Sequence, residues 1–171
     1  MKLLTSIFIA CGLLSSCLAA TVRFTPSNSS VSVLQERAAG TDAVFHQDQV
    51  PHIECNAYTM MSTTPDNTIS RNDCMVVINS IPHGYWDVFN WEDDETYEPI
   101  LGYHTCTFCV SRNDGVKNHV YIGDRDVYYF VSHALDGDRD PLPTFMGSMQ
   151  CLTDDPNNRG DIAWLIRSVP R

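Results

Sequence analysis

The sequence predicts an α+β fold in which two helices pack on a mostly antiparallel sheet, forming a disulfide-stabilised α/β sandwich. Two stretches repeat apolar residues at helical spacing, and five short segments have the composition of strands. Cysteines are also spread along the chain. The predicted order of elements is β-α-β-β-α-β-β, which favours helices segregated to one side of an antiparallel sheet.

The first 20 residues are typical of a secretory signal peptide. Lys2 precedes an apolar run from Leu3 to Leu14, and small residues follow as far as Ala20. That run is shorter than the roughly 20 residues needed to span a bilayer. Residues 21–43 are expected to be a flexible lead-in or pro-segment, and they contain a glycosylation sequon at Asn28. Residues 44–171 are expected to form a single domain of a secreted, extracellular protein.

The first helix is predicted within 70–82. Cys74, Val77, Ile78 and Ile81 recur at helical spacing, so they form one apolar stripe. Ser70 or Asn72 can cap its start, and Pro82 with Gly84 stops it.

The second helix is predicted within 123–137. Its apolar face contains Val127, Phe130, Val131, Ala134 and Leu135. Asp124 is the expected N-cap, and Gly137 is expected to end the helix.

Strands are predicted at 52–60, 102–111, 118–123, 147–152 and 162–168. The second and third of these are expected to form a hairpin through Asn113, Asp114 and Gly115. Trp164 lies in the apolar "IAWLI" segment of the last strand, so it is expected to belong to the core.

Five of the seven cysteines remain after loss of the signal peptide. In an oxidising compartment they should pair, and we predict two intrachain disulfides among Cys55, Cys74, Cys106 and Cys151. Three connectivities are open for these four. Alternate side chains of a strand point to opposite faces, so Cys106 is expected to face the helices and Cys109 the outer, polar face. Cys109 is therefore predicted to be an accessible free thiol, able to form a disulfide-linked dimer.

The Cys106-Thr-Phe-Cys109 spacing does not indicate a zinc or redox site. Zinc would need a tight turn at this motif and two further ligands, and a redox pair would open a helix. No metal site and no cofactor is therefore expected. The six histidines (His46, His52, His83, His104, His119 and His133) occur singly, and no nucleophile motif is present, so no catalytic residue is predicted. The formal net charge of −10 argues against phosphate-driven binding to nucleic acid or to anionic membranes.

Several landmarks resemble one known family, the fungal secreted necrosis-inducing-factor (extracellular effector, killer-toxin-like) domain. Asp73-Cys74 opens the first helix, and Trp86 follows it. A strand with a Cys-x-Phe pattern matches Cys106 to Phe108, and a Gly-x-x-Asp element matches Gly123 to Asp126. The late Gly-x-Met-x-Cys matches Gly147, Met149 and Cys151, and Trp164 matches a terminal Trp strand. The family usually has a small residue where this chain has Cys109.

The resemblance implies a secreted, non-enzymatic effector or toxin-like protein held by disulfides. It would induce necrosis or modulate host defence by binding a target, either a host or competitor-microbe protein or a wall component. We predict a candidate binding loop with Trp91, Asp93, Asp94 and Tyr97. Two alternatives are open. One is a small secreted hydrolase such as an acidic ribonuclease, and the other is a bacterial lipoprotein processed at Cys17 of "LSSC".

Overall fold

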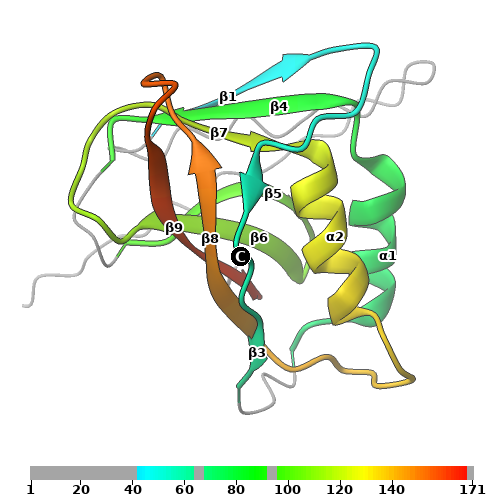
Figure 1. The fold of residues 1–171 in the computed structure, drawn as a ribbon. Helices are drawn as coiled ribbons and strands as arrows, with labels where there is room; N and C mark the ends of the chain where they lie inside the picture. The colour runs from blue at the N-terminus through cyan, green and yellow to red at the C-terminus, as the bar shows by residue number, and fades with distance from the viewer. Residues whose placement is uncertain (1–41, 64–67, 92–95, 169–171) are drawn as a thin grey trace, which may run out of the picture.

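The computed structural model describes residues 42–63, 68–91 and 96–168 (Figure 1). The fold consists of two antiparallel sheets with two helices along one flank. The smaller sheet has the order β1-β4-β7, with β1 at Asp42–Gln47, β4 at Gly84–Phe89 and β7 at Val120–Gly123. The predicted pair of helices and the antiparallel strands are present, but strands dominate the fold and the single predicted sheet is two sheets.

The larger sheet has the order β2-β8-β9-β6-β5, and β3 also pairs with β8. Its strands are β2 (Cys55–Asn56), β3 (Met61–Ser62), β5 (Glu98–Tyr103), β6 (Cys106–Arg112), β8 (Phe145–Leu152) and β9 (Arg159–Arg167). The strand predicted at 52–60 is thus only the two residues of β2. Strands β1, β4 and β5 were not predicted as such, and β1 begins two residues before the predicted domain boundary.

The predicted hairpin between residues 102–111 and 118–123 is wrong. β6 pairs with β5 and β9 in the larger sheet, whereas β7 pairs with β4 in the smaller one. The segment containing Asn113, Asp114 and Gly115 therefore connects two sheets. The turn residues bend the chain locally, but the pairing is decided by long-range packing.

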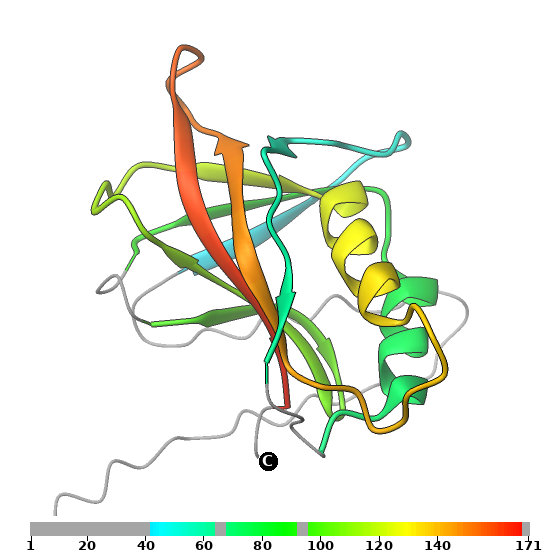
Figure 2. The same ribbon diagram turned by 60° about the horizontal axis from the view of Figure 1, so that its bottom comes forward.

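The helices α1 (Arg71–Ser80) and α2 (Asp124–Ala134) lie side by side, α1 next to β5 and β6 and α2 next to β7 and β4 (Figures 1 and 2). Ser70, one of the two predicted candidates, occupies the N-cap position of α1, but its side chain makes no capping hydrogen bond. The five apolar residues predicted for the inner face of α2 are all buried. The N-cap of α2 is Gly123, so Asp124 is the first helical residue and not the cap.

The core lies between the sheets and the helices. Trp86 of β4, Phe108 of β6, Phe130 of α2 and Trp164 of β9 are among its largest fully buried side chains. The Phe130 and Trp164 rings stack with centroids 4.3 Å apart, which joins the second helix to the larger sheet. The prediction that Trp164 belongs to the core is confirmed.

Candidate functional site

Two disulfides connect distant elements of the fold. Cys55 of β2 is bonded to Cys151 of β8, and Cys74 of α1 is bonded to Cys106 of β6. These are the four cysteines expected to pair, and the structure selects one of the three open connectivities. The first bond links two adjacent strands of the larger sheet, and the second ties helix α1 to β6, the strand next to the edge strand β5 of that sheet.

Cys109 is free but buried, with 0% exposure. The predicted accessible thiol is therefore wrong. Strand parity correctly places Cys109 opposite Cys106, but that second face of β6 is also covered, since every residue of β6 is buried. Burial raises the pKa of the Cys109 thiol to about 11, so little thiolate forms near neutral pH. The disulfide-linked dimer depended on an accessible thiol and loses its basis.

The predicted binding loop does not present an exposed aromatic anchor. Trp91 is 4% exposed, donates its indole N–H to the Asn118 carbonyl at 3.0 Å and packs under the Arg112 guanidinium. Tyr97 is half-buried, and burial raises the pKa of its hydroxyl. Asp93 and Asp94 lie outside the described residues, as does the Asn28 sequon. Trp91 is therefore a buried structural residue, whereas the prediction required an exposed side chain.

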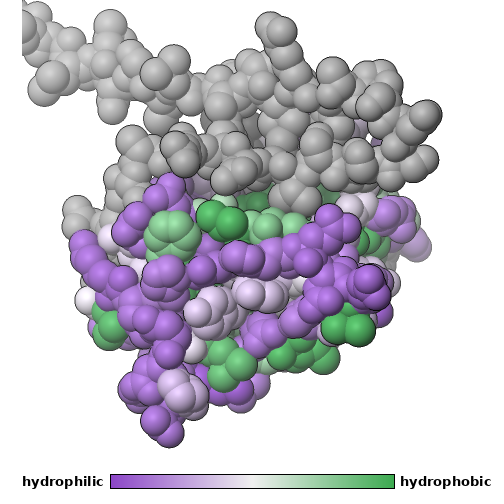
Figure 3. Space-filling model, turned by 90° about the horizontal axis from the view of Figure 1, so that it is seen from above, coloured by the Kyte–Doolittle hydropathy of each residue, from purple (hydrophilic) through white to green (hydrophobic). Residues whose placement is uncertain are grey.

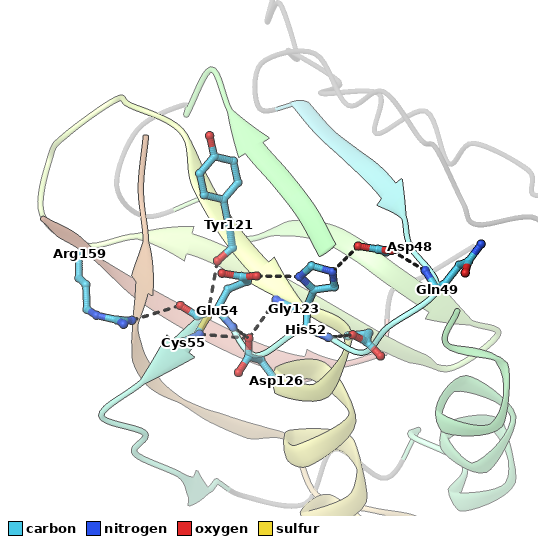
Figure 4. A network of polar contacts seen from close by, with 10 residues as sticks. Asp48, Gln49, His52, Glu54, Cys55, Tyr121, Gly123, Asp126 and Arg159 are labelled. Atoms are coloured by element: carbon cyan, nitrogen blue, oxygen red, sulfur yellow. Dashed lines mark hydrogen bonds and ion pairs between the residues drawn. The ribbon is translucent and has the colours of Figure 1, made fainter. Parts of the chain in front are cut away.

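The N-terminus of α2 anchors the chain segment that leads into β2. The Asp126 carboxylate is 1% exposed, and its Oδ2 accepts the main-chain N–H groups of Gly123, Glu54 and Cys55 at 2.9, 2.9 and 3.2 Å (Figure 4). The Tyr58 hydroxyl lies 2.8 Å from its Oδ1. Burial raises the pKa of the Asp126 carboxyl, and these hydrogen bonds oppose that shift.

Asp124, two residues before Asp126, fastens the same segment. Its Oδ1 accepts the His52 main-chain N–H at 2.6 Å, and the Arg125 N–H donates to the His52 carbonyl at 3.1 Å. Its Oδ2 lies 3.0 Å from Nδ1 of His83. The two aspartates therefore hold residues 52–55 against α2. Because Cys55 belongs to β2, they also fix the position of that strand next to β8.

His52 lies between two carboxylates at the edge of this network. Its Nδ1 lies 2.9 Å from Glu54 and its Nε2 lies 2.9 Å from Asp48 (Figure 4). Hydrogen bonds to Glu54 and then to Asp48 raise the pKa of the imidazole, and the bond to His52 lowers the pKa of Asp48. Because both ring nitrogens face acceptors, the arrangement favours an imidazolium that bridges two acids.

Comparison with known families places these features in context. The Hce2 family model, described as "Pathogen effector; putative necrosis-inducing factor", matches residues 54–151, which is more than half of the chain. The protein belongs to this family of pathogen effectors. No curated protein matches the chain. The matched region of the effector family begins and ends next to the Cys55–Cys151 disulfide, and it contains both disulfides, both helices and the two anchoring aspartates.

Sequence reasoning missed an aromatic group on the outer face of the smaller sheet of this effector. The rings of Tyr85 and Tyr121 meet edge to face with centroids 5.7 Å apart, and His46 stacks on Tyr85 at 4.9 Å. A signal for these residues existed. β4 alternates buried and half-buried residues, which puts Tyr85, Asp87 and Phe89 on one face.

In the part of the chain that the structure describes, no group of three or more His, Cys, Asp or Glu side chains is arranged to hold a metal ion. Among the same residues, none of the helices has the length and apolar character of a membrane span.

Proposed function

We propose that the protein is a secreted effector that acts without catalysis, by binding a host or competitor-microbe component through its folded surface. The observation that carries the proposal is the family match over residues 54–151. Two intramolecular disulfides support the extracellular part of the proposal, because such bonds persist in oxidising compartments.

The hydrogen bonds of the two buried aspartates, Asp124 and Asp126, support binding in preference to catalysis. The carboxylate oxygens of Asp126 and Asp124 are hydrogen-bonded to main-chain N–H groups, to a tyrosine hydroxyl and to the ring of His83. A general base needs a free lone pair directed at substrate, whereas both nitrogens of His52 face carboxylates of the protein itself. The hydrolase alternative thus gains no support from this histidine.

The test is infiltration of the purified, oxidised protein into leaf tissue, with reduced and alkylated protein as the unfolded control. We expect a tissue response, necrosis or altered defence, that requires the intact disulfides. Alanine substitution of each of the six histidines should change the response by no more than a few-fold. Loss of the response in one His→Ala variant with an unchanged circular dichroism spectrum would instead favour an enzyme.

A second measurement addresses secretion. The intact mass of the protein recovered from culture medium should correspond to a chain that begins near residue 21. A mass that includes residues 1–20, or a lipid attached at Cys17, would contradict the proposed processing.

A further inference from the structure

The outer face of the β1-β4-β7 sheet carries a row of aromatic, histidine and aspartate side chains. In the register of this sheet, His46 lies opposite Tyr85, and Asp87 lies opposite Tyr121, so their side chains share one face. At the end of this row the Phe89 ring stacks with His119 at 4.9 Å. Figure 3 views the molecule from above; among the residues not drawn in grey, hydrophilic residues predominate and residues of intermediate and apolar character lie between them.

A small open pocket of about 110 Å³ lies on this face, lined by Glu54, Tyr85 and Tyr121. The two rings are nearly perpendicular, so the pocket combines an aromatic face with a ring edge. Figure 4 shows Glu54 between His52 and Tyr121. His52 contacts Oε1 of Glu54, and a carboxylate has two oxygens, so Oε2 can accept a hydrogen bond from a ligand.

The charges around the pocket are mostly negative. Asp48 and Glu54 flank His52, and Asp87 is bonded to His119. The pKa of the Tyr121 hydroxyl is raised, first by burial and then by the negative charges of Asp87 and Asp154. The Arg159 guanidinium donates hydrogen bonds to the main-chain carbonyls of Glu54 and Gln150 and so does not neutralise the Glu54 carboxylate directly. An incoming ligand therefore meets carboxylates next to half-buried tyrosine rings.

We infer that this face is a docking surface for a cationic segment of a partner protein, with an arginine or lysine side chain seated between Tyr85, Tyr121 and Glu54. The inference rests on the proposed function, since it names the chemistry of the target that the effector binds. Two features of the face and one of the whole chain match such a side chain. A cation is attracted to the face of a tyrosine ring, a guanidinium or ammonium can donate a charged hydrogen bond to the open Oε2 of Glu54, and the chain carries a formal net charge of −10.

The test is an NMR titration of the isotope-labelled, oxidised protein with a capped Gly-Arg-Gly-Arg-Gly peptide at physiological salt. The same peptide with citrulline in place of arginine removes the charge and keeps the shape. We expect shifts centred on the amides of Glu54, Tyr85 and Tyr121 with the arginine peptide only. Equal binding of the citrulline peptide, shifts spread over the whole acidic surface, or no binding would overturn the inference.

Matched variants locate the site. Tyr121→Ala and Glu54→Gln should each weaken binding of the arginine peptide by about fivefold or more, the size of a cation–π contact or of one charged hydrogen bond. Tyr128→Ala removes an exposed tyrosine on α2, and Asp136→Asn removes an exposed charge beyond that helix, so both should bind within twofold of the wild type. Equal losses in Glu54→Gln and Asp136→Asn, with no loss in Tyr121→Ala, would show that long-range charge alone attracts the peptide and would refute the pocket.

Three further outcomes are informative: the first tests the class of partner, and the other two separate this inference from the proposed function. If a glucosamine oligomer displaces the arginine peptide from the pocket with higher affinity, the partner is a cationic sugar and the assignment to a protein segment is wrong. If the wild type is active in tissue and Tyr121→Ala and Glu54→Gln are equally active, the docking surface is wrong and the proposed function stands. If the wild type is inactive in tissue yet binds the peptide at the pocket, the proposed function fails and the peptide-binding surface stands.

Discussion

Replacement of Asp126 by alanine is expected to loosen the joint between α2 and the segment that enters β2. The carboxylate accepts three main-chain N–H groups and lies against a tyrosine hydroxyl. Gly123 and Cys55 are buried, so their N–H groups would lose their partner out of reach of water. A buried donor left unpaired costs about 1–3 kcal/mol.

Two such donors correspond to a loss of about 2–6 kcal/mol, against a typical total stability of about 5–15 kcal/mol. Removal of a buried charge offsets part of that loss, so we expect a decrease in the free energy of unfolding of about 3 kcal/mol. Asp126→Asn keeps one oxygen acceptor and should fall between the wild type and the alanine variant.

The assay is urea denaturation of the oxidised protein, followed by tryptophan fluorescence. Asp136→Ala is the matched control, because Asp136 is exposed and its loss should change stability by less than about 0.5 kcal/mol. A midpoint for Asp126→Ala equal to that of this control would refute the view that the carboxylate holds residues 52–55 in place.

Three other predictions concern the cysteines and the bridging histidine. Replacing the Cys55–Cys151 pair by alanines should cost about 1 kcal/mol more than replacing Cys74–Cys106 in thermal unfolding, because the sequence separations are 96 and 32 and chain entropy grows with loop length. Cys109 should not react with a thiol reagent in native protein at pH 8 and should react once urea unfolds the chain, since its thiol is buried and its pKa is about 11. The His52→Gln variant should lose melting temperature mainly between about pH 4 and 6.5, where His52 is charged and Asp48 ionised. Because the pKa of His52 is higher in the folded protein than in the unfolded chain, its charge stabilises the fold below the unfolded pKa, and this stabilisation is lost as the pH rises through the folded pKa. Because the pKa of Asp48 is lower in the folded protein, its stabilising contribution is present above the unfolded pKa and is lost as the pH falls through the folded pKa. A loss of melting temperature that does not vary with pH would mean that His52 acts by packing alone.

The cysteines and the helices show how far local patterns reach. The apolar spacing of α2 predicted its buried face, because a helical period is a property of neighbouring residues. The set of paired cysteines followed from the expected oxidising compartment, the count of five, and strand parity, which left Cys109 over. The pairing itself depends on which strands and helices are adjacent, and Cys55 and Cys151 are opposite each other only because β2 joins β8.

Trp91 and Cys109 show why the exposure of a side chain was mispredicted. A tryptophan in an acidic stretch has the composition of a binding loop, yet here its N–H finds the Asn118 carbonyl and its ring is buried. Strand parity separates two faces of β6 but contains no information on whether another part of the fold covers the second face.

The amino-acid order alone was sufficient for two amphipathic helices, a core tryptophan at Trp164, four cysteines suited to pairing and a resemblance to an effector family. Each of these depends only on residue types and their spacing along the chain. The aromatic pocket depends on contacts between strands, since Glu54, Tyr85 and Tyr121 come from three separate segments. They meet because β4 pairs with β7 and because Asp124 and Asp126 hold residues 52–55 against α2. The alternation along β4 indicates the face that Tyr85 occupies, but burial and long-range pairing are properties of the folded chain as a whole, and only they bring the three residues together.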